Sequence, residues 1–207
     1  MKRMIIRAAA AAGSLALVGG AVVAGAAPAG AQDTTNGAYG AATGGTIFTA
    51  PVANASPGNS PLVASNDNVP GVLSTGVILD RSDPNGSSSH VTQGVVINVP
   101  GYGKIQASGV DTWCRIIDDG NNVIGGTTIT AGAITFFNRS TNSTFSMTLP
   151  MHPVPNDVIT LPNGEGTVTL NVQTDDGGEM GFGGIYAQLA GGQNVVVAVS
   201  ACFIFEG

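Results

Sequence analysis

A series of short β-branched segments over residues 71–207 constrains the fold more than any other feature of the chain. Turn-forming clusters such as Asp83-Pro84-Asn85-Gly86 and Asn163-Gly164 separate the segments. Helical periodicity is absent, and glutamate, lysine, arginine and glutamine, which favour helices, are scarce. Many short strands with a turn about every ten residues predict an all-β protein, an antiparallel β-sandwich of Greek-key or jelly-roll type.

The expected strands are VLSTGVILD, HVTQGVVINV, KIQASGVDTWCRII, TTITAGAITFF, STFSMTL, DVITL, GTVTLNVQ, GGIYAQLA and NVVVAVSACFIF. The last of them is apolar at both alternating positions from Val195 to Ala198, which predicts an inner strand rather than an edge.

Residues 1–31 have the composition of a secretory signal peptide. Lys2, Arg3 and Arg7 precede a long Ala/Gly-rich apolar run, and Ala29-Gly30-Ala31 forms a small-residue cleavage site. Pro28 interrupts the run and no basic flank follows it, so a membrane anchor is the less favoured interpretation. We expect cleavage before Gln32 and no stable membrane insertion afterwards.

Residues 32–70 are rich in Asn, Ser, Pro, Gly and Ala and cannot supply a packed face by themselves. This composition predicts a loose N-terminal arm or loose first strands, with one short strand near Thr46–Thr49. The β-sandwich domain is expected to span residues 71–207.

The mature chain would be strongly acidic. Removal of the leader leaves four basic residues against thirteen acidic ones, a formal net charge of −9. A nucleic-acid partner is excluded, because no basic stripe is present to displace counterions from phosphates. Docking to anionic lipid is disfavoured for the same reason.

Two cysteines, Cys114 and Cys202, lie beyond the leader. In an exported chain the default expectation is one disulfide. Two buried thiols are the alternative, and a metal pair is disfavoured because no CxxC or HxxxH spacing exists.

Several short motifs, in this order along the chain, resemble the choice-of-anchor P family of exported, largely actinobacterial surface proteins. The motifs are AYG (38–40), ASGVDTWC (107–114), GGTTITAGAIT (125–135), LPNGEGTVTLNVQ (161–173) and VVVAVSACFIF (195–205). The resemblance implies a surface or extracellular location and no established enzyme activity.

The chain departs from the family pattern at Asn163, which looks inserted, and at Val172, where the family tends to have glutamate. No sorting motif or hydrophobic tail follows Phe205, so the resemblance implies a member that is released or held by the wall non-covalently.

Two acidic turns are calcium candidates. The first contains Asp175, Asp176 and Glu179, and the second contains Asp118 and Asp119. Neither has the ligand register of an EF-hand loop, and Asp and Gly also favour turns for backbone reasons alone. The expectation is therefore no cofactor, with calcium as the alternative.

Catalytic patterns are lacking. Asp111 lies within an expected strand, where an ion pair with Arg115 would explain it, and no second carboxylate can be placed opposite it. His90 and His152 have no recognisable serine partner, and no GxSxG elbow occurs. The sequence thus predicts a protein that is not an enzyme.

A sugar-binding face would need exposed aromatic rings on one sheet. Trp113, the only tryptophan, adjoins Cys114, so packing on the disulfide is its expected role. Tyr102, in the loop PGYGK, is the candidate for an exposed, ligand-facing ring.

These observations favour an exported, non-catalytic β-sandwich that binds cell-wall or extracellular macromolecules as an adhesion or matrix module. The first alternative is a self-assembling surface subunit, a homo-oligomer whose N-terminal segment adds a strand to a neighbour's sheet. The second is a secreted glycan- or ester-active hydrolase that uses Asp111.

Overall fold

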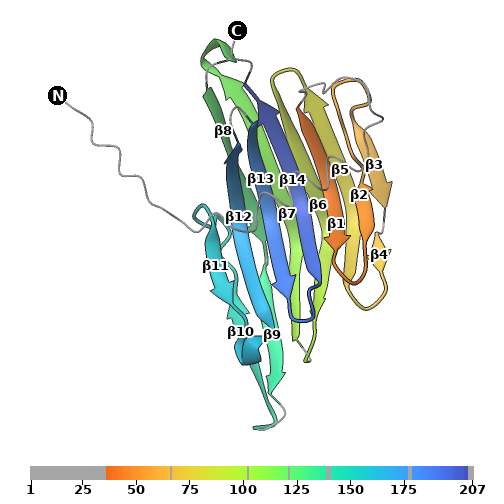
Figure 1. The fold of residues 1–207 in the computed structure, drawn as a ribbon, viewed down its shortest axis with the longest axis vertical. Coiled ribbons are helices and arrows are strands. Elements are labelled where there is room, and N and C mark those ends of the chain that lie inside the picture. The colour runs from red at the N-terminus through yellow and green to blue at the C-terminus, as the bar shows by residue number, and fades with distance from the viewer. Residues whose placement is uncertain are drawn as a thin grey trace, which may run out of the picture. The chain divides into compact units, whose positions relative to one another are not determined.

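A computed structural model of the protein describes residues 36–204, apart from residues 66, 102, 121, 139–140 and 177–178 and the side chains of Asp119, Asn163 and Asp176. The expected signal peptide, residues 1–31, and Tyr102 lie outside the described residues. The described chain is an antiparallel β-sandwich, which confirms the predicted fold class (Figure 1).

The first layer is a six-stranded sheet. Its strand order is β11 (Asp157–Thr160), β12 (Gly166–Asp176), β13 (Glu179–Leu189), β14 (Asn194–Phe203), β1 (Gly37–Gly44) and β2 (Thr49–Val52). β14 lies between β13 and β1, so the last expected strand is an inner strand, as its apolar pattern predicts.

The second layer is an eight-stranded sheet. Its main order is β10 (Ser143–Thr148), β9 (Ala133–Asn138), β7 (Gly103–Ile117), β6 (Gly86–Val99), β5 (Leu73–Asp83) and β3 (Leu62–Ser65). β8 (Asn122–Thr130) pairs with β7, and β4 (Asn68–Val69) pairs with β5. Two 3-10 turns, η1 (Asp118–Gly120) and η2 (Pro162–Gly164), complete the described elements.

One expected strand is divided in the structure. TTITAGAITFF contributes to both β8 and β9, because Ala131 has a φ of 48° and breaks the ladder. β8 then pairs with the Gly109–Ile117 half of β7, whereas β9 pairs with the Gly103–Gln106 half.

The segment expected to be a loose arm or loose first strands forms β1 to β4. β1 pairs with β14 on one side and β2 on the other, and residues Ala38, Ala41 and Ala42 are buried. The short strand expected near Thr46–Thr49 is instead mostly the turn between β1 and β2.

Two buried amide side chains hold β1 and its turn in place. Asn36 donates from Nδ2 to the carbonyl of Asp83 (2.8 Å) and accepts from the backbone N–H of Phe203 (2.9 Å). Gln193 donates from Nε2 to the carbonyl of Gly44 (2.8 Å) and accepts from the N–H of Ile47 (2.9 Å). Composition alone does not reveal such long-range contacts, which is why the sequence predicts a loose segment where the structure has the paired strand β1.

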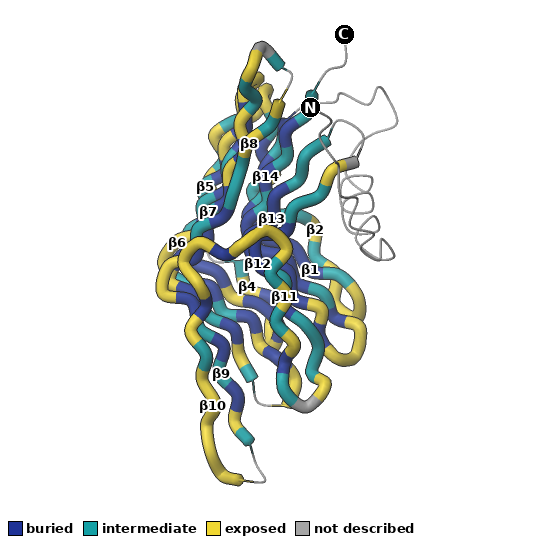
Figure 2. The backbone as a smooth tube through the Cα atoms, turned by 90° about the vertical axis from the view of Figure 1, so that its left-hand side faces the viewer, coloured by how far each residue is buried: buried dark blue, intermediate teal, exposed yellow. Residues whose placement is uncertain are grey.

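Buried residues lie along the strands of both sheets (Figure 2), and the interior that they form has three zones. The largest is an apolar core that includes Ile78, Val91, Val110 and Ile129, one continuous cross-strand row on β5 to β8. A second apolar cluster surrounds Cys114 and Cys202.

A polar row separates these two clusters. Its members are Asp80, Ser89, Thr112 and Thr127, which are adjacent in register on β5, β6, β7 and β8 and are all buried. Buried polar groups without partners oppose folding, so this row is a costly part of the interior.

Candidate functional site

The candidate site lies on β5, β6 and β7. These strands have one surface that points away from the six-stranded sheet, called the outer face below, and it carries the partly exposed ionisable and aromatic side chains described next. Strand alternation fixes it, because Asp80, Ser89 and Cys114 are buried whereas their neighbours Arg81 and Trp113 are exposed. The inward direction is confirmed by the disulfide, which joins Cys114 of β7 to Cys202 of β14 in the other sheet.

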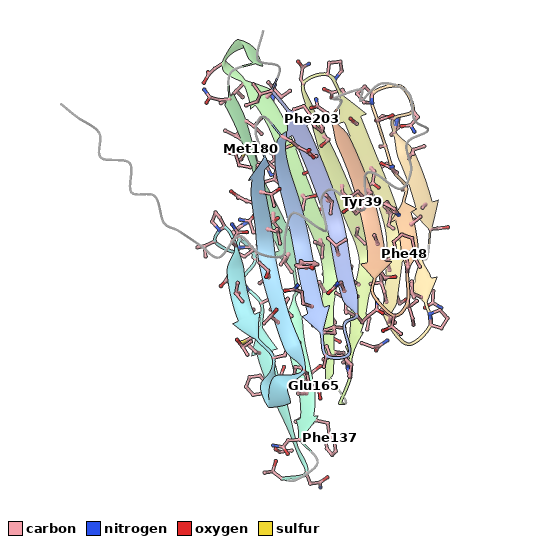
Figure 3. The ribbon with its side chains drawn as sticks, in the orientation of Figure 1. Tyr39, Phe48, Phe137, Glu165, Met180 and Phe203 are labelled. Atoms are coloured by element: carbon pink, nitrogen blue, oxygen red, sulfur yellow. A yellow bond between two sulfur atoms is a disulfide. The ribbon has the colours of Figure 1, made fainter. Side chains whose placement is uncertain are left out.

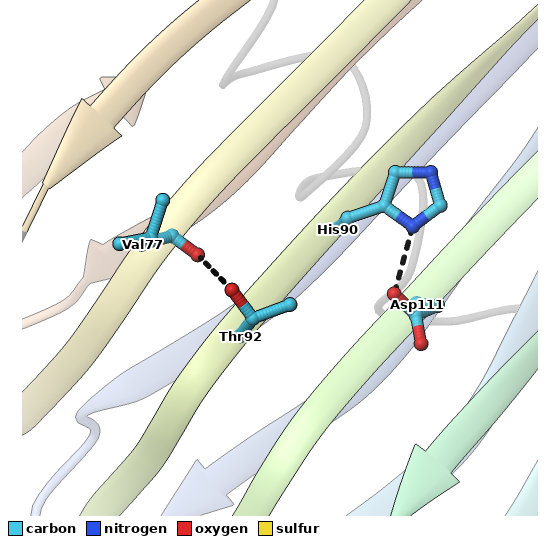
Figure 4. Close-up of polar contacts among 4 residues, drawn as sticks. All are labelled: Val77, His90, Thr92 and Asp111. Atoms are coloured by element: carbon cyan, nitrogen blue, oxygen red, sulfur yellow. Dashed lines mark hydrogen bonds and ion pairs between the residues drawn. The ribbon is translucent and has the colours of Figure 1, made fainter.

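His90 and Asp111 form a cross-strand pair on the outer face (Figure 4). Nδ1 of His90 lies 2.8 Å from Oδ1 of Asp111, with the side chains 41% and 32% exposed. The expected partner of Asp111 was Arg115, so that expectation is wrong. Arg115 lies four residues after Asp111 on the same face of β7, whereas His90 lies directly opposite Asp111 on β6.

The pair does not extend into a catalytic triad among the described residues. Among the described residues, no hydrogen bond joins Nε2 of His90 to a hydroxyl, although this nitrogen is the one that would activate a nucleophile. His152 is exposed in the segment between β10 and β11 and does not contribute to the pair. The neighbouring bond in Figure 4, from Thr92 Oγ1 to the carbonyl of Val77 (3.3 Å), joins β6 to β5.

Trp113 is on the outer face and is 42% exposed. The expectation that it packs on the disulfide is therefore wrong, because adjacent residues of a strand point to opposite sides and Cys114 points inward. The indole Nε1 lies 4.0 Å from the position that a Cβ at Gly126 would occupy, so the bare backbone of β8 leaves room for the ring.

A hollow of about 400 Å³, called the Trp113 hollow below, lies beside this ring. Arg81 of β5 and Arg115 of β7 line it together with Trp113, and Ser88 and Gly86 of β6 form its middle. In register, Arg81 faces Ser88 and Ser88 faces Trp113.

The sequence does not predict this hollow. The relevant sequence pattern is a large residue at position 81 in β5, large residues at 113 and 115 in β7, and small residues at 86 and 88 in β6, the strand between them. Without the register of β5, β6 and β7, nothing brings these three stretches together.

A second hollow of about 580 Å³ adjoins the first. Asn85 and Arg115 line both of them, and Phe203 and Ile117 line only the second. Arg115 therefore stands between two neighbouring depressions.

The calcium candidates occupy strand ends and a turn. Asp175 and Asp176 end β12, where Asp176 pairs in register with Glu179 at the start of β13. Asp118 and Asp119 belong to η1, and Asp118 Oδ2 accepts a hydrogen bond from Asn122 Nδ2 (2.8 Å). Within the described ranges, no three His, Cys, Asp or Glu side chains come together as a metal site.

The other exposed rings do not form one aromatic platform. The exposed rings of Phe48, beside the β1–β2 turn, and Phe137, in β9, lie far from each other along the chain and at separate places on the sandwich, and the half-buried ring of Phe203 lies at the end of β14 (Figure 3). Of the aromatic side chains that the structure describes, Trp113 is the one that shares a hollow with two cationic groups, whereas Phe203 shares the second hollow with Arg115 alone.

Asp80 is a titratable group of the interior rather than of the outer face. It is fully buried, and neither of its carboxyl oxygens has a hydrogen bond of good geometry with the described residues. Burial raises the pKa of Asp80 to about 7, although nearby Ser89, His90 and the Gly40 amide lower it in part. Asp80 is therefore protonated in acidic solution.

No protein-family model matches the chain, and neither the curated proteins nor the solved structures contain a significant match to it. The part of the chain that the structure describes contains no helix with the length and apolar character needed to span a bilayer.

Proposed function

We propose that this protein is an exported, non-catalytic β-sandwich that acts outside the cytosol as a cell-surface or matrix-binding module. The observation that carries the proposal is the Cys114–Cys202 disulfide, which joins the two sheets. Disulfides persist in oxidising compartments and are rare in the cytosol, so the bond supports the export predicted from residues 1–31. The acidic, lysine-poor composition suits a soluble extracellular chain.

Kinship with the choice-of-anchor P family is part of this proposal. It rests on the order of the short motifs, of which ASGVDTWC and VVVAVSACFIF contain the two bonded cysteines.

Export is tested by expressing the full chain in an actinobacterial host and separating medium, wall and cytosol. We expect the protein in the medium or wall fraction, with Gln32 as its first residue and with both cysteines protected from alkylation until reduction. Ala29→Phe combined with Ala31→Phe should block cleavage, whereas Ala24→Phe, within the apolar run, should leave it intact. A full-length, reduced protein in the cytosol would contradict the proposal.

Catalysis is tested separately with glycan and ester substrates. We expect wild-type protein and the Asp111→Asn variant to release product at the same background rate, because His90 lacks a nucleophile partner among the described residues. Turnover by the wild type that disappears in Asp111→Asn would show that the protein is a hydrolase.

The self-assembly alternative receives no support from β1. This strand pairs with β14 and β2 of its own chain, so neither of its edges is open to a neighbour.

A further inference from the structure

The Trp113 hollow exists because a strand of small residues lies between two strands of large ones. Ser88 separates Arg81 from Trp113 in one cross-strand row, and two strand spacings place the outer residues about 10 Å apart. Gly86 cannot carry a side chain, because an added Cβ would lie 2.4 Å from the carbonyl oxygen of Cys114. The sequence therefore keeps the middle of the hollow open.

The hollow concentrates positive charge on a chain that is acidic overall. The structure describes three Lys and Arg side chains, namely Arg81, Lys104 and Arg115, and two of them line the hollow. No carboxylate of the described residues lies within ion-pair distance of either guanidinium. The Asp83 carboxylate also lines the hollow, but its Oδ1 accepts a hydrogen bond from the backbone N–H of Asn85 (2.7 Å).

Two guanidinium groups with no carboxylate partner among the described residues lie beside an exposed indole, and this combination suits a ligand that has both an anionic group and a flat apolar face. Guanidinium groups bind carboxylates through paired hydrogen bonds, and the face of an indole packs against flat apolar surfaces. A pyranose ring with a carboxylate substituent offers both an apolar face and an anion. A volume of about 400 Å³ is within the range of small-ligand sites.

The adjoining hollow indicates a ligand longer than one sugar unit. It shares Arg115 with the Trp113 hollow and adds Phe203 and one acidic residue, Asp118, which accepts a hydrogen bond from Asn122. A polysaccharide could therefore place successive units on either side of Arg115. Extended nucleic acid would need many more cationic contacts than the two that are present.

We propose that the Trp113 hollow binds an acidic sugar unit of an extracellular polysaccharide, with the indole of Trp113 under the ring and Arg81 and Arg115 on its carboxylate groups. The extracellular source of the ligand rests on the proposed function, whereas the site itself rests on the geometry of the hollow.

The test is calorimetric titration of the untruncated protein with three ligands. They are an oligomer of a hexuronic acid, a neutral hexose oligomer of the same length, and inorganic sulfate. We expect binding of the acidic oligomer, weakened by added salt, and at least tenfold weaker binding of the other two. Equal binding of the neutral oligomer or of sulfate would overturn the proposal.

Variants locate the site. Arg81→Ala, Arg115→Ala and Trp113→Ala should each weaken binding of the acidic oligomer by about tenfold or more. Lys104→Ala removes a matched charge elsewhere on β7, and Phe145→Ala removes an exposed ring on β10, so both should stay within about twofold of wild type.

If Lys104→Ala weakened binding of the acidic oligomer as much as Arg115→Ala does, binding would depend only on net charge. That result would refute the Trp113 hollow as the binding site. The titration uses purified protein, so an exported chain that fails to bind the acidic oligomer refutes this inference alone. A cytosolic chain that binds it refutes the proposed export alone.

Discussion

Asp80 shows how one buried residue couples the stability of this fold to pH. Its carboxyl group lies in the polar row between the two apolar clusters, where charging it requires desolvation of an anion. The folded state therefore binds its proton more tightly than the unfolded state, in which the pKa returns to 3.8.

The sign of the pH effect follows from the raised pKa. Below about pH 4 the Asp80 carboxyl group is protonated in both the folded and the unfolded state, so burying it costs no charge desolvation. As the pH rises toward 7, the carboxyl group ionises only in the unfolded state. We expect the free energy of unfolding to fall by about 1.4 kcal/mol per pH unit in this window, on the order of 4 kcal/mol in all.

The Asp80→Asn variant should not show this fall in unfolding free energy, and it should be more stable than wild type at pH 8. Urea unfolding between pH 4 and 8 measures the free energy of both proteins. Asp83→Asn is the control, because Asp83 is an exposed neighbour on β5. Parallel pH profiles for wild type and Asp80→Asn would contradict the assignment.

The His90–Asp111 pair should contribute little to stability, because both side chains are partly exposed to water. We expect a double-mutant cycle of His90→Gln and Asp111→Asn to give a coupling energy below about 1 kcal/mol. The measurement is denaturant unfolding of the four proteins near pH 6. A coupling of several kcal/mol would indicate a network beyond the described contacts.

At the scale of the elements, close approach of the two sheets depends on glycine in β13. A Cβ at Gly184 would lie 2.3 Å from Cγ1 of Val110 on β7 and 2.9 Å from the carbonyl oxygen of Val197. Gly184→Ala should therefore cost about 1–3 kcal/mol of unfolding free energy through overpacking.

Gly44→Ala is the matched control, because an added Cβ there meets nothing within 4 Å. Adding Val110→Ala to Gly184→Ala should recover part of the loss, so that the double variant is more stable than the sum of the two single effects predicts. Thermal unfolding of wild type, the Gly44→Ala control, the two single variants and the double variant decides this. A Gly184→Ala variant as stable as the control would show that the layers can move apart freely.

The elements also show the limits of local patterns. Ala198 has a φ of 55° within β14, and on its two sides both Val197 and Ser200 are fully buried. The apolar residues at both alternating positions correctly predict an inner strand, yet they do not reveal that the strand changes its inward-facing parity at this residue. A neighbouring sheet is needed to tell which side is inward.

At the scale of the whole molecule, the Cys114–Cys202 bond links β7 and β14 across a sequence separation of 88 residues. The chain-entropy model assigns on the order of 4–5 kcal/mol to a loop of this length, because the bond restricts the unfolded chain. We expect Cys114→Ala with Cys202→Ala to lose about that much unfolding free energy. Reduction of the wild-type protein during denaturant unfolding is the independent measurement, and a loss below about 1 kcal/mol in both would contradict the prediction.

The sequence alone determined the fold class and the approximate strands of residues 71–203, and it favoured a disulfide between the two cysteines over two free thiols. These follow from local periodicity, turn residues and the fact that two cysteines allow a single bond. It did not determine that residues 37–44 form an inner strand, that Asp111 meets His90, or that Trp113 is exposed beside Arg81 and Arg115. Each of these features depends on which strands are neighbours and on the register between them. Only the packed pair of sheets decides the register, because a shift of one residue exchanges the buried and exposed faces of a strand.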